Sequence, residues 1–92
     1  MQDTHETKFL VFSRTKQQNK KTYDVEVHNK HGELLAKMYW RTGWRTYVVN
    51  VQPDIDLDIK CWDDIGAYIR LLLEERLIQL ASEIKKENKG VL

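Results

Sequence analysis

The fold is decided by residues 34–51, whose sequence is LLAKMYWRTGWRTYVVNV. Two runs, Leu34–Arg41 and Trp44–Val51, are rich in β-branched and aromatic residues and flank a Thr42-Gly43 pair. This pattern predicts two antiparallel strands joined by a short turn. A two- or four-residue loop gives one continuous apolar face, in which the predicted cross-strand pairs are Trp40 with Arg45, Met38 with Tyr47, Ala36 with Val49 and Leu34 with Val51.

Two further segments extend this hairpin toward the N-terminus. Tyr23–His28 alternates apolar and polar residues, which predicts a half-buried strand, and the apolar run Phe9–Phe12 predicts a short first strand. A glycine-containing turn at 29–32 joins the half-buried strand to the hairpin. The predicted pairs across that turn are Val27 with Leu34 and Val25 with Ala36. Both valines then lie on the apolar face of the hairpin.

A long helix follows the sheet. Pro53 ends the strands because proline cannot donate to a ladder, and Asp63 or Asp64 is the predicted N-cap. A helix from there to residue 89 measures roughly 39 Å against strands of about 25 Å, so part of it must extend past the sheet. That part carries apolar residues at the 4-3-4 spacing of a short coiled-coil seam, namely Leu73, Leu77, Leu80 and Ile84. This spacing fits contact with a partner helix or a second copy, and it fits a fully intramolecular stripe equally well.

The predicted fold class is therefore α+β. We expect an antiparallel β-meander of three to four strands, with one long C-terminal helix packed on one face. The 92 residues suit a single domain. Its predicted segments are a disordered tail at 1–7, a β-meander at 8–52 with a solvated basic loop at 14–22, an extended connection at 53–62 and the helix at 63–89.

Composition narrows the class of function. The chain is 41% hydrophobic and 32% charged, which is typical of globular proteins, and its net charge of +1 disfavours a dedicated nucleic-acid binder. One cysteine excludes an internal disulfide and fits a reducing compartment. No signal peptide or membrane span is visible, so we expect a cytoplasmic protein without membrane partners.

Catalytic and metal-binding motifs are missing from the sequence. Asp54, Asp56 and Asp58 resemble the start of a calcium loop, but isoleucine stands where that loop needs glycine and glutamate. His28 and His31 lie beside a turn without further ligands at metal-binding spacing. Cys61 is interpreted as a structural thiol. We expect no enzyme activity, no cofactor and no metal.

The residues around Thr42-Gly43 are the candidate binding residues. The sheet face opposite the apolar one holds Leu35, Lys37, Tyr39, Arg41, Trp44, Thr46 and Val48. Stacking of Arg41 on Trp44 and of Arg45 on Trp40 is expected across the hairpin. Three interpretations remain open: a structural clamp, an anchor for a protein partner, or a platform on which a base stacks. The predicted binding residues are Lys37, Tyr39, Arg41, Trp44 and Arg45.

The pattern also resembles a known group. Trp40-x-x-x-Trp44-Arg45-x-Tyr47, followed by Pro53 and a C-terminal helix, is similar to small proteins encoded by bacteriophages and mobile elements. The resemblance covers residues 23–73. The chain departs from this pattern in two ways. Gly43 occupies a position where proline is expected, and the helix after Leu73 is longer than usual. The resemblance implies an accessory protein and assigns no chemistry.

The leading functional expectation is a non-catalytic phage or mobile-element accessory protein that binds another protein, such as a host factor. The first alternative is nucleic-acid or nucleotide binding through Tyr39, Arg41, Trp44 and the lysines of 16–21. The second alternative is a structural homodimer formed through the C-terminal helix.

Overall fold

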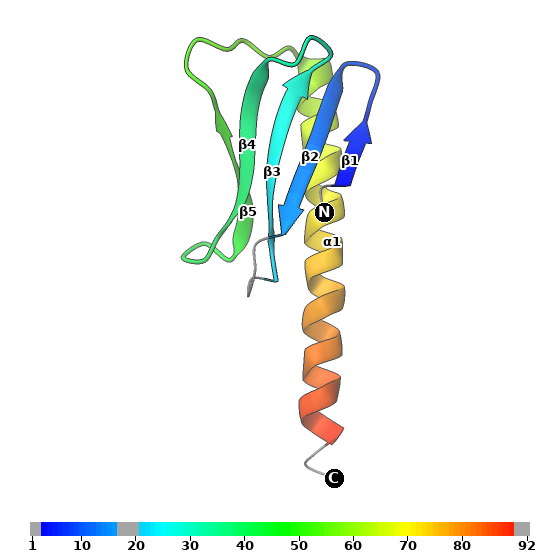
Figure 1. The fold of residues 1–92 in the computed structure, drawn as a ribbon. Helices are drawn as coiled ribbons and strands as arrows, with labels where there is room; N and C mark the ends of the chain where they lie inside the picture. Colours follow the sequence, from blue (N-terminus) through cyan, green and yellow to red (C-terminus); the bar gives the residue numbers. More distant parts are fainter. Residues whose placement is uncertain (1–2, 17–20, 90–92) are drawn as a thin grey trace.

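A computed structural model describes residues 3–16 and 21–89, with the side chains of the last helix described as far as Glu83. It contains one five-stranded antiparallel sheet of order β1-β2-β3-β4-β5, followed by one helix. Figure 1 shows the helix running along one face of the sheet and continuing past its end. The elements are β1 Asp3–Glu6, β2 Leu10–Lys16, β3 Tyr23–Asn29, β4 Leu34–Arg41, β5 Thr46–Val51 and α1 Ile59–Lys89.

The expectation of three to four strands was wrong, because the structure has five. The additional strand is β1, which lies within the predicted disordered tail at 1–7 and pairs with β2. The sequence of β1, DTHE, contains no aliphatic residue, so apolar alternation could not reveal it. The imidazole of His5 nevertheless lies against the rings of Phe12 and Tyr68, which links this polar strand to the core.

The basic loop predicted at 14–22 was also partly wrong. β2 continues through Lys16, so residues 14–16 are paired with β3 rather than solvated loop. Residues 17–20 lie outside the described part of the chain. The strand continues past Phe12 because Arg14, like Leu10 and Phe12, lies on the face that α1 covers. There its guanidinium donates hydrogen bonds to residues of α1.

The register of the β4–β5 hairpin differs from the prediction by two residues. Trp40 pairs with Tyr47, Met38 with Val49 and Ala36 with Val51, so Trp44 and Arg45 belong to a four-residue turn instead of the strand. Because side chains alternate with a period of two, a shift of two residues leaves the paired residues 36–41 and 46–51 on their predicted faces.

The β3–β4 pairing shows the same shift and one irregularity. Val25 pairs with Met38 and Val27 with Ala36, but His28 then pairs with Leu34. The extra residue on β4 is therefore Leu35, which forms a β-bulge. Leu35 was predicted on the uncovered face, and this was wrong, because the bulge turns it into the core. Gly32, in the turn between β3 and β4, has a positive φ of 86°.

α1 begins earlier than predicted. Its N-cap is Asp58 rather than Asp63 or Asp64, since the Asp58 carboxylate accepts the backbone N–H of Cys61 at 3.0 Å. The extended connection therefore ends at residue 58, and Ile55 and Leu57 within it pack against the core. Several aspartates precede this helix, and propensity alone cannot choose among them.

This cap leads to a pH-dependent prediction. The hydrogen bond from the Cys61 N–H, together with that from its thiol, lowers the pKa of Asp58 below 3.8. A carboxyl group with a lowered folded-state pKa stabilises the fold above its unfolded value and loses this contribution as the pH falls through the folded value. Asp58→Ala is expected to lower the melting temperature at neutral pH, and the difference from wild type is expected to shrink below about pH 3.8. Thermal melts across this range check it, with the exposed Asp56→Ala as the control; a difference that grows in acid would contradict the assignment.

The core lies between α1 and the face of the sheet that the prediction made apolar. α1 contributes one stripe to it at helical spacing, Ile65, Tyr68 and Leu72, all buried. The strands and the bulge contribute Leu10, Phe12, Val25, Val27, Leu35, Ala36, Met38 and Tyr47. Among the described residues, no element packs against the other face of the sheet.

The C-terminal part of α1 extends beyond the sheet (Figure 1). With 31 residues α1 measures about 46 Å, whereas the eight residues of β4 measure about 27 Å. Leu77 and Ile78 are 65% and 69% exposed on this part. In the part of the chain that the structure describes, no helical segment has the length and apolar character needed to span a bilayer.

Candidate functional site

The predicted binding residues lie on β4 and in the turn that follows it: Lys37, Tyr39 and Arg41 alternate along β4, and Trp44 and Arg45 belong to the turn. The N–H of Trp44 donates to the carbonyl of Arg41 at 3.1 Å, and the N–H of Arg45 donates to the carbonyl of Thr42 at 3.2 Å. Arg45 closes the turn in the left-handed region at a φ of 52°. These two backbone bonds fix where the Trp44 and Arg45 side chains emerge.

The guanidinium of Arg41 stacks on the indole of Trp44, with Cζ 3.9 Å from the ring centroid. This contact confirms one of the two predicted stacking pairs. Trp44 is still 63% exposed, and Tyr39 and Lys37 are also exposed on the same face of β4. We call Lys37, Tyr39, Arg41, Trp44 and Arg45 the tryptophan-turn surface.

The second predicted stack, Arg45 on Trp40, was wrong because of the two-residue register difference. Trp40 instead lies edge-on to Tyr47, with ring centroids 5.4 Å apart, on the face covered by α1. The guanidinium Cζ of Arg76, on α1, lies 5.6 Å from the centroid of the Trp40 ring. The two tryptophans of the hairpin thus lie on opposite sides of the sheet, and only Trp44 faces away from α1.

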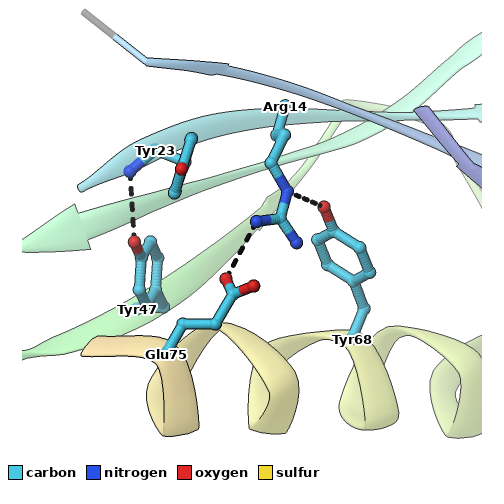
Figure 2. A network of polar contacts seen from close by, with 5 residues as sticks. All are labelled: Arg14, Tyr23, Tyr47, Tyr68 and Glu75. Carbon is cyan, nitrogen blue, oxygen red and sulfur yellow. Dashed lines mark hydrogen bonds and ion pairs between the residues drawn. The ribbon is translucent and has the colours of Figure 1, made fainter. Parts of the chain in front are cut away.

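A second polar site, which was not predicted from the sequence, lies between β2 and α1. Figure 2 shows Arg14 reaching from β2 to two residues of α1. Its Nε donates to the hydroxyl of Tyr68 and its Nη1 to the carboxylate of Glu75, both at 2.8 Å. The guanidinium also lies 4.8 Å from the ring centroid of Tyr23. Arg14 therefore joins the sheet to the helix across the edge of the core.

The electrostatics of this network favour a permanently charged arginine. Burial acts to lower the pKa of Arg14, but the hydrogen bonds and charges of Tyr68 and Glu75 outweigh it and the pKa is raised. Nearby, the hydroxyl of Tyr47 accepts the backbone N–H of Tyr23 at 3.1 Å, and burial raises the pKa of Tyr47. The hydroxyl of Tyr47 therefore stays protonated beside the charged guanidinium of Arg14.

An open pocket of about 250 Å³ adjoins Arg14, and Thr4, His5, Tyr68 and Glu75 complete its lining. Within this pocket the positive charge of Arg14 is balanced by the carboxylate of Glu75, with which it forms an ion pair. Two signals in the sequence could have revealed this site. Arg14 continues the inward alternation of Leu10 and Phe12, and Glu75 continues the inward stripe of α1.

Only some of the predicted helix-interface residues are exposed enough to contact a partner helix. Leu73 packs against the core, and Leu80 is partly buried. Leu77 is exposed, whereas the side chain of Ile84 lies outside the described residues. The four residues therefore do not form one uniformly exposed seam as far as the structure describes them.

The other polar candidates have local partners. His28 Nε2 lies 3.6 Å from the Glu26 carboxylate on the same strand. Burial raises the pKa of the Cys61 thiol, and neighbouring Asp58 adds to that effect, so Cys61 is a poor nucleophile. Among the described residues, no group of three or more histidine, cysteine, aspartate or glutamate side chains is placed to hold a metal ion.

Fold and surface together define a small α+β protein with one uncovered sheet face and an aromatic–arginine turn. By sequence, the chain belongs to a family of small phage proteins. It is 44% identical over 75 residues to an uncharacterized 9.3 kDa protein of Acholeplasma phage L2, an alignment that covers 80% of this chain and 96% of the relative. No protein-family model matches the chain, and no solved structure matches it. The expected phage origin is confirmed at the level of the family.

Proposed function

We propose that this protein is a non-catalytic phage accessory protein that binds another protein through the tryptophan-turn surface. The observation that carries the proposal is Trp44, which is 63% exposed while Arg41 stacks on its ring at 3.9 Å. Most of the apolar surface of this indole is exposed to solvent and is not packed against the rest of the protein. Its apolar area is therefore available to a partner.

The geometry of the turn suits an interface anchor. Tryptophan, tyrosine and arginine are the residues that most often dominate binding energy. The Arg41 stack and the two turn hydrogen bonds hold the indole in place before any partner arrives. A side chain ordered in advance loses less conformational entropy on binding, so more of the contact energy becomes affinity.

The charges of the surface indicate the kind of partner. Lys37, Arg41 and Arg45 are exposed around Tyr39 and Trp44, and none of the five residues is acidic. A complementary partner presents an apolar pocket with an acidic rim, which would also accelerate association. Since the family is phage-encoded, we place this binding in the cytoplasm of the host cell and propose a host factor as the partner.

Of the lysines that would support nucleic-acid binding, the two that the structure describes, Lys16 and Lys21, do not extend this surface. Lys16 lies near the ring of Tyr23, and Lys21 pairs with Glu83 on α1, the covered side of the sheet. Residues 17–20 lie outside the described part of the chain. With a net charge of only +1, we favour protein over nucleic acid as the partner.

Trp44→Ala is expected to abolish partner capture and leave the fold intact. Loss of a central anchor costs about 2 kcal/mol or more, which corresponds to roughly 30-fold weaker binding. Tagged wild-type and Trp44→Ala proteins can be compared by capture from host lysate, followed by titration of the captured protein. Trp62→Ala is the matched control, because Trp62 is also an exposed tryptophan but lies on α1.

The proposal requires that the same protein be captured by wild type and Trp62→Ala and lost with Trp44→Ala. Circular dichroism should show all three variants folded. Equal capture by Trp44→Ala, or unfolding of that variant, would remove the tryptophan-turn surface as the site. A shift of labelled oligonucleotide at low salt that depends on Trp44 would favour the nucleic-acid alternative instead.

A further inference from the structure

The strand β5 forms an edge of the sheet and differs in character from the opposite edge, β1 (Figure 1). Natural edge strands are usually protected by charges, proline, bulges or short length. β1 has four residues, of which Asp3 and Glu6 are charged. β5 has six residues, TYVVNV, with no charged residue and no proline. It is thus the edge that is open to pairing with another strand.

The register shows which backbone groups of β5 point outward. Gln52 donates its N–H to the carbonyl of Leu35 at 2.9 Å, directly after the Ala36–Val51 pair. In an antiparallel ladder, hydrogen-bonded and non-hydrogen-bonded pairs alternate. Thr46, Val48 and Asn50 consequently direct their N–H and C=O groups to β4. The groups directed away from the sheet belong to Tyr47, Val49 and Val51.

We propose that β5 pairs in antiparallel orientation with β5 of a second copy, with Val49 on the two-fold axis. In this register Val49 faces its own counterpart, and Tyr47 faces Val51 of the second copy. Every outward-directed residue of the strand then meets another outward-directed residue, which gives two hydrogen bonds in each of the three pairs. The two sheets become one continuous sheet, and the interface is isologous.

The charges at the two ends of β5 complement each other in this arrangement. Arg45 precedes the strand, whereas Asp54 follows it, and both are exposed. Antiparallel pairing about Val49 brings the basic end of each copy beside the acidic end of the other. Between these ends no like charges oppose each other, because residues 46–51 are uncharged. A parallel arrangement would instead place Arg45 beside Arg45.

The side chains also favour this contact. Val49 and Val51 are only partly buried on the α1 side of β5. A second copy would cover them with its own Val51, Val49 and Tyr47. Pro53 then ends the new ladder, because it has no N–H with which to continue it.

Val49→Pro tests the proposal directly, since it removes the outward N–H at the two-fold axis in both copies. Light scattering is expected to give a mass near twice 11.0 kDa for wild type. The dissociation constant of the variant dimer is expected to be about 100-fold higher than that of wild type. Thr4→Pro is the matched control, because it removes an outward N–H from the opposite edge strand, β1. The N–H of Thr7 donates to the carbonyl of Leu10, and hydrogen-bonded pairs alternate along the β1–β2 ladder. The N–H of Thr4 therefore points away from β2. Leu77→Glu tests the helix seam separately.

Dimerisation that is lost with Val49→Pro and retained with Thr4→Pro and Leu77→Glu supports the proposal. A monomeric wild type up to about 1 mM, or a dimer lost only with Leu77→Glu, overturns it. If Val49→Pro does not fold, amide exchange of wild type decides. Protection of Tyr47, Val49 and Val51 that rises with concentration supports the β5 pairing, and unchanged exchange overturns it.

Discussion

Replacement of Phe12 by alanine is expected to lower the free energy of unfolding by about 3–5 kcal/mol, the largest single effect we anticipate. Phe12 is fully buried between β2 and α1. Its ring stacks on Tyr68 with centroids 4.4 Å apart and planes 10° apart, and His5 lies against it from β1. Alanine would leave a cavity where three elements meet. Domains of this size are stable by roughly 5–15 kcal/mol, so much of the fold's stability would be lost.

Urea unfolding followed by circular dichroism measures this effect. Phe9→Ala is the matched control, because Phe9 is the adjacent phenylalanine on the chain and is 40% exposed. Its cost is expected to stay within about 1 kcal/mol. Equal destabilisation by the two variants would mean that Phe12 does not occupy the centre of the helix–sheet contact.

Arg14→Met is expected to destabilise the fold by about 2–3 kcal/mol. The Arg14 side chain is only 11% exposed, and methionine retains most of its apolar stem while removing the guanidinium. The hydroxyl of Tyr68 and the carboxylate of Glu75 would each lose a charged donor at 2.8 Å. Because Glu75 is 42% exposed and can be hydrated, the loss is expected to stay below that of a fully buried ion pair.

A double-mutant cycle with Tyr68→Phe isolates the hydrogen bond between the two residues. If the bond stabilises the fold, the coupling between the two changes is expected to reach about 1 kcal/mol. Lys16→Met, an exposed cation on the same strand, is the control and should change stability by less than about 0.5 kcal/mol. Additive single and double variants would show that Arg14 acts through packing of its stem and not through Tyr68.

The alternation of residues predicted which side of β3, β4 and β5 faces the core, apart from the bulged Leu35, but not how these strands align. Met38 and Val49 were both placed on the apolar face, although their pairing with each other was missed. A shift of two residues preserves every face, so hydrophobic patterning cannot distinguish the two registers. The backbone of the turn decides, and Arg45 adopts a left-handed conformation that the residue type does not suggest.

The candidate site was only partly predicted for the same reason, because hydrophobic patterning does not show which residues of different strands or of the helix come into contact. The Arg41–Trp44 stack is present in spite of the shift because Trp44 lies in the turn and Arg41 directly precedes the turn, whereas Arg45 and Trp40 are not brought together. β1 could not be found because its residues are polar and its place depends on pairing with β2. Arg14 was assigned to a loop because charge usually indicates solvent, and its partners on α1 lie far away in the sequence.

The position of α1 in the chain affects how the protein is made. All five strands precede α1, yet the apolar face of the sheet is covered by Ile65, Tyr68 and Leu72 of that helix. During synthesis the strands therefore leave the ribosome before the residues that cover them. A nascent chain interrupted before these positions would expose a sheet face and an uncharged edge, both prone to aggregation. Synthesis of α1 as far as Leu72 is thus the step that covers the apolar face of the sheet, whereas the β5 edge stays open until it meets a partner strand.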